Sequence, residues 1–170
     1  DGSGSRSASG AALGGIAGAV AGNVWSSRMA KQKQEMEQAT QGTGVQVSQT
    51  TDNRLKLDIP SDISFETNRS DIQPNFRAIL DKFSLGLVEN PTSRITIVGH
   101  TDSTGSDAIN QPLSFDRAAR TRDYLATRGV ATTRFSIDGR GSHEPVASND
   151  TSAGRAKNRR VEIFVAEPQR

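Results

Sequence analysis

The chain of 170 residues contains no cysteine, and this absence removes several kinds of site at once. Without thiols, the protein forms no disulfide framework, holds no metal through thiolates and has no cysteine nucleophile. Aromatic residues are sparse, at 5%, and hydrophobic residues make up only 33% of the sequence. This low apolar content, together with 16 glycines, predicts one folded domain accompanied by a segment that lies outside its core.

The chain also lacks a predominance of either sign of charge. Lys and Arg number 21, Asp and Glu number 19, and the formal net charge is +2. The two signs are mixed along the sequence, whereas a nucleic-acid-binding domain gathers its cations on one face or along one helix. We therefore expect no nucleic-acid partner.

The longest apolar run covers residues 10–24 and is shorter than the roughly 20 residues that span a bilayer as a helix. Four glycines in this run recur every four residues: Gly10, Gly14, Gly18 and Gly22. In a helix they share one face without side chains, where another helix can approach closely. We interpret this pattern as a glycine zipper that contacts the outer membrane or self-associates. The alternative is a disordered Gly/Ala linker, since each glycine disfavours a helix by about 1 kcal/mol.

Residues 29–40 are rich in helix-forming residues and have few apolar ones, which predicts a solvated helix or spacer. Gly42 and Gly44 end this stretch. We therefore divide the chain into a zipper and linker at residues 1–40 and a folded domain at residues 41–170.

Strand and helix periodicities alternate within the predicted domain. Residues 45–49 and 54–59 alternate apolar and polar side chains around a Thr-Asp-Asn turn, which predicts a hairpin. A helical stripe that should face the core follows Pro74: Phe76, Ile79, Leu80, Phe83 and Leu87. The further elements expected are strands at 94–98, 134–137 and 160–165, a helix at 114–128 and a helical turn at 152–158. This order predicts an α+β fold of βαβαβ type, with a mixed sheet of about four strands and helices packed on one face.

The stretch from Ile95 to Ala118 carries the residues best suited to chemistry. Where its strand ends, three polar residues follow Gly99: His100, Thr101 and Asp102. Arg117 falls in the first turn of the helix predicted at 114–128. An acid and a guanidinium in one crevice suit a ligand that carries both charges. The alternative from spacing alone is an ion pair of Arg117 with Asp102 or Asp116 and no ligand.

Four motifs occur in the same order as in a known family: Gly99-His100-Thr101-Asp102, Asn110, Leu113-Ser114-x-x-Arg117-Ala118 and Asn158-Arg159-Arg160-Val161-Glu162. In these motifs the chain resembles the OmpA-like C-terminal domain over about residues 55–165. The resemblance implies non-covalent peptidoglycan binding in the periplasm of a Gram-negative bacterium. A glycine zipper before such a domain resembles the YiaD-type outer-membrane lipoproteins, which implies attachment to the outer membrane. Those lipoproteins carry a lipidated N-terminal Cys, and this sequence has none.

The resemblance also implies a ligand, the diaminopimelate residue of the peptidoglycan stem peptide, whose free end has an ammonium and a carboxylate on one carbon. On this basis Asp102 accepts the ammonium and Arg117 grips the carboxylate. Thr101, Asn110 and Arg159 add hydrogen bonds to the same end or to the stem backbone.

Glu66 is a further candidate for the site. It stands in Phe65-Glu66-Thr67-Asn68, where the family usually has Phe-Asp-x-Asn. The longer acid suits the rim of the site, but a loop carboxylate that caps backbone amides is an equal alternative.

Motifs for catalysis, metals and cofactors are missing from the sequence. It has no Gly-x-Ser-x-Gly elbow and no phosphate-binding loop of the Walker type. His100 and His143 lack an acid at metal-ligand spacing. Glu66 and Asp102 are poor acids for glycoside hydrolysis because nearby arginines keep carboxylates ionised.

We therefore expect a binding protein with no enzymatic activity, no metal and no cofactor. The alternative function is a protein-interaction module of an envelope assembly for secretion, motility or signalling.

Overall fold

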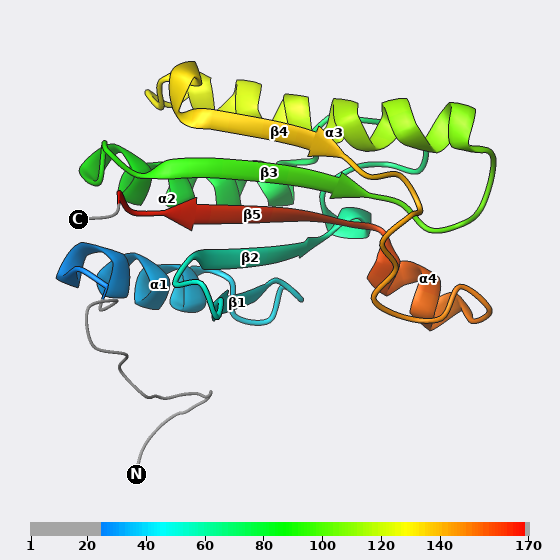
Figure 1. Ribbon diagram of the computed structural model, residues 1–170, viewed down its shortest axis with the longest axis horizontal. Helices are drawn as coiled ribbons and strands as arrows, with labels where there is room; N and C mark the ends of the chain where they lie inside the picture. Colours follow the sequence, from blue (N-terminus) through cyan, green and yellow to red (C-terminus); the bar gives the residue numbers. More distant parts are fainter. Residues whose placement is uncertain (1–24, 169–170) are drawn as a thin grey trace, which may run out of the picture.

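The computed structural model describes residues 25–168, which form one mixed sheet and four α-helices (Figure 1). The helices are α1 (Ser27–Ala39), α2 (Pro74–Glu89), α3 (Asp107–Thr127) and α4 (Ser152–Asn158). The strands are β1 (Gln46–Gln49), β2 (Leu55–Pro60), β3 (Arg94–His100), β4 (Phe135–Gly139) and β5 (Arg160–Ala166). Short 3-10 turns follow β2 at Ser61–Ile63 and precede β4 at Thr132–Arg134.

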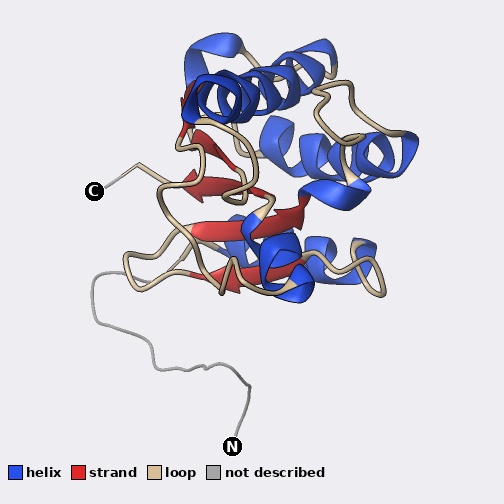
Figure 2. Cartoon of the chain, turned by 90° about the vertical axis from the view of Figure 1, so that its right-hand side faces the viewer, coloured by secondary structure: helices blue, strands red, loops and turns tan. Residues whose placement is uncertain are grey.

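The sheet has the strand order β1-β2-β5-β3-β4. β3 and β4 are parallel and the other pairs are antiparallel, so the predicted α+β class and mixed sheet are confirmed. The sheet has five strands rather than about four, because the hairpin at β1 and β2 contributes both its strands. Helices α1, α2 and α3 lie on one face, and no helix of the described residues covers the other (Figures 1 and 2).

The core lies between these three helices and the sheet. Alternate residues of the central strands point into it: Leu55, Leu57, Ile59, Ile95, Ile97, Val161, Ile163 and Val165. Every residue of the stripe predicted on α2 is buried there as well. Apolar side chains recur at every second residue on the strands and about every 3.6 residues on the helix, and the two sets pack together in one hydrophobic layer.

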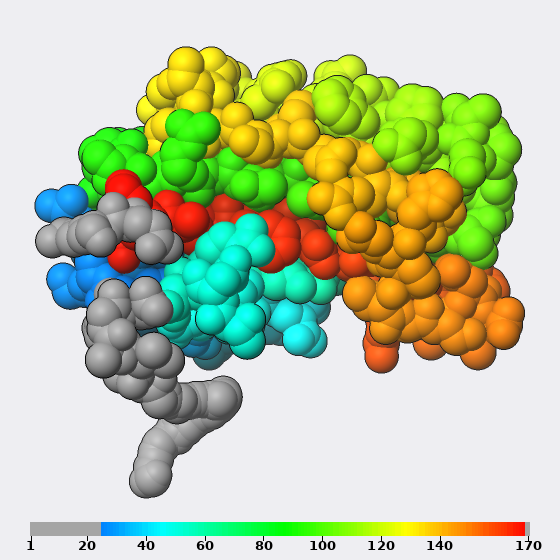
Figure 3. Space-filling view, viewed as in Figure 1, coloured from blue at the N-terminus to red at the C-terminus, as the bar shows by residue number. Residues whose placement is uncertain are grey.

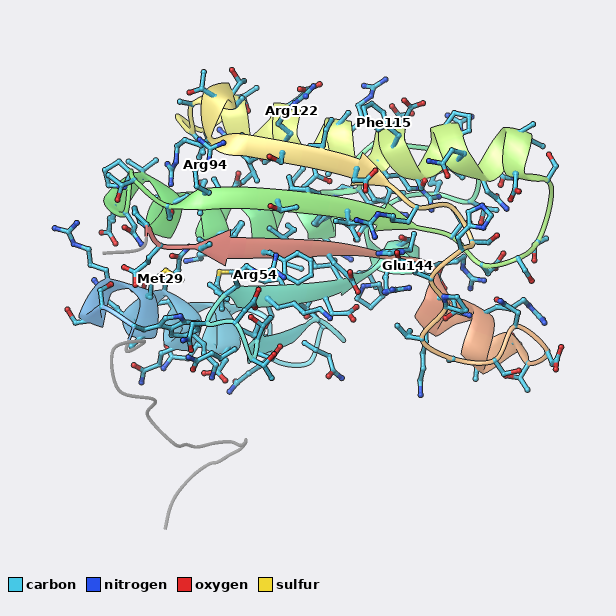
Figure 4. All side chains as sticks on the ribbon, in the orientation of Figure 1. Met29, Arg54, Arg94, Phe115, Arg122 and Glu144 are labelled. Carbon is cyan, nitrogen blue, oxygen red and sulfur yellow. The ribbon has the colours of Figure 1, made fainter. Side chains whose placement is uncertain are left out.

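The predicted helix forms as α1. It belongs to this core, however, so the expectation that it is solvated is wrong for the face that carries its methionines. Met29 is 0% exposed and Met36 is 2% exposed, and α1 packs against α2 (Figure 4). Two methionines spaced by two turns are enough to bury one face, although the helix is polar elsewhere. The four zipper glycines lie outside the described residues.

The start of α1 is tied to distant parts of the domain. The indole Nε1 of Trp25 donates to the backbone oxygen of Asn53 at 2.6 Å. The backbone nitrogen and the hydroxyl of Ser26 both donate to the carboxylate of Glu167, which follows β5. The N-terminal segment therefore enters the domain beside its C-terminal end (Figure 1). Among the described residues, no helix combines the length and the hydrophobicity needed to cross a membrane.

Helix α3 starts at Asp107, about two turns before the start predicted at residue 114. Pro112 lies inside α3 and has no backbone N–H to donate, so one hydrogen bond of the helix is missing, yet the helix continues to Thr127. Arg117 is therefore in the middle of α3, and the prediction that it lies in the first turn of this helix is wrong. The helix lies very close to β3: a Cβ on Gly99 would be 2.0 Å from the Ser114 carbonyl oxygen.

The burial of α1 leads to a first prediction. Met29→Ala should lower the free energy of unfolding by about 2–5 kcal/mol, because it removes a fully buried side chain and leaves a cavity. Urea denaturation followed by circular dichroism measures the change. Lys31→Ala on the exposed face of the same helix is the control and should change stability by no more than about 0.5 kcal/mol. Equal effects of the two substitutions would contradict the packing of α1.

Candidate ligand-binding site

Polar residues converge at one end of the sheet, where β2, β3 and β4 end and β5 begins (Figure 1). Several charged side chains reach this end, and four of them act on one another: Asp62 from the turn after β2, Asp102 from the loop after β3, Arg117 from α3 and Arg159 from the residue before β5. The space-filling view shows α4 and the loop before it, in orange, projecting at this end next to the light green start of α3 (Figure 3).

Arg159 bridges two acids. Its Nη1 donates to Asp102 Oδ2 at 2.6 Å. On its other edge, Nε and Nη2 donate to the two oxygens of Asp62, each at 2.9 Å. These hydrogen bonds, of which those to Asp62 matter most, raise the pKa of Arg159 above its ordinary value.

Asp62 is a member of the site that the sequence interpretation misses. The register of the sheet pairs Pro60 of β2 with Arg160 of β5, so residues just beyond each of them become neighbours. The pairing of these two strands is the only clue to Asp62, and a motif search along the chain cannot supply it.

Asp102 is 7% exposed and is held by its own loop. Its Oδ1 accepts a hydrogen bond from the backbone nitrogen of Thr104 at 2.8 Å. The hydroxyl of Thr101 donates to the Asp102 carbonyl oxygen, and the amide of Asn110 donates to the carbonyl oxygen of Thr104 at 3.0 Å. Thr101 and Asn110 thus lie beside Asp102, as the sequence predicts, and their side chains fix the backbone that carries it.

Burial alone would raise the pKa of Asp102, since it removes water from the carboxylate. Hydrogen bonds from Arg159 and Thr104 outweigh burial and hold the pKa below its ordinary value. Asp102 is therefore an anion across the physiological pH range, able to accept hydrogen bonds but not to donate a proton.

Arg117 is 4% exposed and interacts electrostatically with this cluster, and within residues 25–168 it forms no ion pair. Its Nε donates to the Arg69 carbonyl oxygen at 2.9 Å, and its Nη2 donates to the Glu66 carbonyl oxygen at 3.3 Å. Its guanidinium carbon lies 5.0 Å from the centroid of the Phe65 ring. Burial lowers the pKa of Arg117, and the charge of Asp62 opposes that shift.

The two ion pairs considered for Arg117 do not form. Neither Asp102 nor Asp116 lies within salt-bridge distance of it among the described residues. Glu66 is exposed and joins the cluster through its backbone carbonyl oxygen. The carbonyl oxygens of the Phe65–Asp71 loop thus orient Arg117, while acids on other elements orient Arg159.

A second charged group lies on the sheet face that no described helix covers. Glu162 accepts from Arg160 Nε at 2.9 Å and pairs with His100 Nε2 at 3.1 Å, and the three side chains are nearly buried. Burial pushes up the pKa of Glu162, but hydrogen bonds from His100 and Arg160 outweigh it and lower the pKa to about 2. His100 therefore packs and bonds within the sheet, directly behind the loop of Asp102.

The chain is thus a domain of the α+β class with a cluster of charged side chains at one end of a mixed sheet. The chain belongs to the OmpA family, whose family model matches residues 64–159.

The chain is also similar in sequence to individual proteins. The chain is 35% identical over 138 residues to the probable lipoprotein YiaD of Escherichia coli, a match that covers 81% of this chain and 63% of the lipoprotein. It is 48% identical over 103 residues to the peptidoglycan-binding protein ArfA of Mycobacterium tuberculosis, covering 61% of this chain and 32% of ArfA. The chain thus matches less than two thirds of the length of either relative.

Solved structures share the fold. The cell wall anchor of the type VI secretion system (T6SS) of Pseudomonas aeruginosa superposes with a TM-score of 0.69 and 30% identity, covering 82% of this chain and 97% of the anchor. The periplasmic domain of Helicobacter pylori MotB superposes with a TM-score of 0.67 and 30% identity, covering 76% of this chain and 85% of that domain.

The lowered pKa of Glu162 predicts an acid-sensitive contribution to stability. A group with a depressed folded pKa stabilises the fold above its unfolded pKa, and this contribution is lost as the pH falls through the folded value. For Glu162 the window runs from about pH 5 down to about pH 2, and the full contribution is about 3 kcal/mol. Glu162→Gln should therefore make the free energy of unfolding less dependent on pH in this window.

Urea denaturation at a series of pH values measures this dependence. The exposed Glu89→Gln is the matched control and should keep the wild-type pH dependence. An unchanged slope in Glu162→Gln would show that the buried group on the sheet face does not carry this contribution.

Proposed function

We propose that the chain binds peptidoglycan non-covalently through the diaminopimelate end of the stem peptide, and so tethers the outer membrane to the cell wall in the periplasm of a Gram-negative bacterium. Membership of the OmpA family supports this proposal, as does similarity to a protein named for peptidoglycan binding and to one described as a cell wall anchor.

The observation that carries the proposal is the charge balance of the site. Two acids and two arginines, Asp62, Asp102, Arg117 and Arg159, meet at one end of the sheet, and their formal charges cancel. A ligand that is only an anion or only a cation upsets this balance, whereas a group with one charge of each sign preserves it. The free end of diaminopimelate is such a group, with its ammonium and carboxylate on the same carbon.

The hydrogen bonds of the site leave capacity for this ligand. Each oxygen of Asp102 accepts one strong hydrogen bond from protein, and a carboxylate oxygen has two acceptor positions, so an ammonium can be added. Arg117 uses one N–H of Nε and one of Nη2 on carbonyl oxygens, and a guanidinium has five. Arg117 therefore keeps donors for the ligand carboxylate, on a side chain that is already oriented.

The state of the acids favours binding over catalysis. Glycoside hydrolysis requires one carboxylic acid that is protonated at working pH. Asp102 has the opposite property, because its hydrogen bonds lower its pKa. Asp62 is in a two-pronged pair with Arg159.

Attachment to the membrane belongs to the N-terminal segment in this proposal. Trp25 enters the domain at the end of the sheet opposite to the site, so membrane and wall are held at opposite ends. The zipper glycines add contact with the outer membrane or with a second copy. Because the wall is a polymer, many weak contacts give firm attachment through avidity.

An NMR titration of the full chain with meso-diaminopimelate tests the proposal. Wild-type protein should show shifts at Thr101, Asp102, Asn110 and Arg117. Asp102→Asn should weaken binding at least about tenfold, because the ammonium loses its anionic partner. Asp81→Asn, which changes a partly exposed acid on α2 that pairs with Arg128, is the matched control and should bind as wild type. Sedimentation with intact sacculi should rank the three proteins in the same order.

The outcomes separate the two candidate functions. Equal binding by Asp102→Asn would contradict the role of the crevice. A wild-type protein that neither shifts with meso-diaminopimelate nor sediments with sacculi would favour the alternative function, a protein-interaction module of an envelope assembly. Arg117→Ala is the weaker probe because it also removes the hydrogen bonds to the carbonyl oxygens of Glu66 and Arg69.

A further inference from the structure

Asn149 joins the two loops that carry the acid and the guanidinium of the site. Its side-chain oxygen accepts two hydrogen bonds, one from Asn158 Nδ2 at 2.9 Å and one from the backbone nitrogen of Ser103 at 3.3 Å. Ser103 follows Asp102 in the chain, Arg159 follows Asn158, and Arg159 Nη1 bonds to Asp102 at 2.6 Å. These five residues close a circle of covalent links and hydrogen bonds, which we call the Asn149 ring.

Asn158 fixes the inner side of this ring. It is 0% exposed, and its oxygen accepts from the backbone nitrogens of Val146 at 2.7 Å and Ala147 at 2.9 Å. Its nitrogen donates to the Ala147 carbonyl oxygen at 2.9 Å as well as to Asn149. All four hydrogen-bonding positions of the amide are thus filled, so the side chain has one orientation and holds the loop before α4 against the start of β5.

Arg160 ties the ring to the sheet. Its Nη1 donates to the Asn158 carbonyl oxygen at 3.2 Å and its Nη2 to the Glu144 carbonyl oxygen at 3.1 Å. Its Nε is held by Glu162. Figure 4 shows Glu144 close to the start of β5, where the loop after β4 crosses the end of the sheet. The buried pair of Arg160 and Glu162 on the sheet face therefore holds the backbone of Asn158 in place.

We propose that Asn149 and Asn158 are positioning residues of the ligand site, which set the separation of Asp102 and Arg159 before a ligand arrives. Neither asparagine side chain bonds to the carboxylate or the guanidinium; they act on the two loops behind them. The proposal rests on the proposed function for the identity of the ligand, while the coupling of the two loops is a property of the free protein.

The physical reason for such a device is preorganisation. Arg159 is a long side chain that a ligand would otherwise have to order, and a loop after a strand has freedom of its own. A ring that has already restricted both loops lowers the cost of binding without adding a contact to the ligand. Both hydrogen bonds that Asn149 contributes to the ring are accepted by its side-chain oxygen. An aspartate at this position can accept both of them, and an alanine can accept neither, so the two substitutions should have different effects on the ring.

The first experiment measures meso-diaminopimelate affinity of the full chain by NMR titration in a double-mutant cycle. Asn149→Ala should weaken binding about tenfold in the wild-type background and leave it unchanged in an Arg159→Ala background, since the ring is already open there. Asn149→Asp should bind within about threefold of wild type. Asn75→Ala, at an exposed position on α2, is the matched control and should have no effect. Equal losses in the two backgrounds would overturn the proposal.

The second experiment needs no ligand. Hydrogen exchange of the Ser103 backbone amide and of the Asn158 side-chain amide, which both donate to the Asn149 oxygen, should be faster in Asn149→Ala than in wild type and close to wild type in Asn149→Asp. Unchanged exchange in Asn149→Ala rejects the ring whatever the affinities are. A wild-type protein that fails to bind meso-diaminopimelate, with the exchange effect intact, instead rejects the ligand assigned under the proposed function.

Discussion

The antiparallel pairing of β5 with both β2 and β3 is the constraint on which the site depends. Because β5 runs against its two neighbours, its first residue lies beside their last ones: Arg160 pairs with Pro60 and with His100. The residues just outside the sheet, Asp62, Asp102 and Arg159, are thereby brought to one point from positions up to 97 residues apart. A slip of one residue would turn Glu162 into the core and Val161 out of it, so hydrophobic burial fixes the register of the site.

The two arginines of the site reach similar positions by different means. Arg117 is buried within α3 and is oriented by carbonyl oxygens, so its charge faces the cluster without being neutralised by direct contact. Arg159 is more exposed and is oriented by two carboxylates. One cation therefore retains attraction for an anionic group, while the other keeps Asp102 ionised. Because only Arg159 is paired with the acids, Arg117 keeps N–H donors for a ligand although all four charges lie close together.

Local pattern predicts most of the fold, and the errors have physical causes. The hairpin and the stripe on α2 follow from periodicity, which burial against one layer imposes on each element. Helix α1 is misjudged because two methionines in a polar helix look solvated until a partner helix is known. The start of α3 is misplaced because its first two turns bury no apolar side chain and so carry no periodic signal. Motifs bring Thr101, Asp102, Asn110, Arg117 and Arg159 to attention, whereas Asp62 depends on the pairing of distant strands, which no local window contains.

The position of Ser26 has a mechanical consequence. Its bonds to Glu167 place the start of the described chain at the far end of β5, and the first residue of β5 adjoins Arg159. Tension between a bound wall and the N-terminal segment would run nearly parallel to β5, whose neighbours β2 and β3 lie along its sides. The ladders on both sides of the strand would then be strained in shear, so that many hydrogen bonds share the force instead of opening one after another. The same sheet that assembles the site would in this way make the domain resistant to stretching.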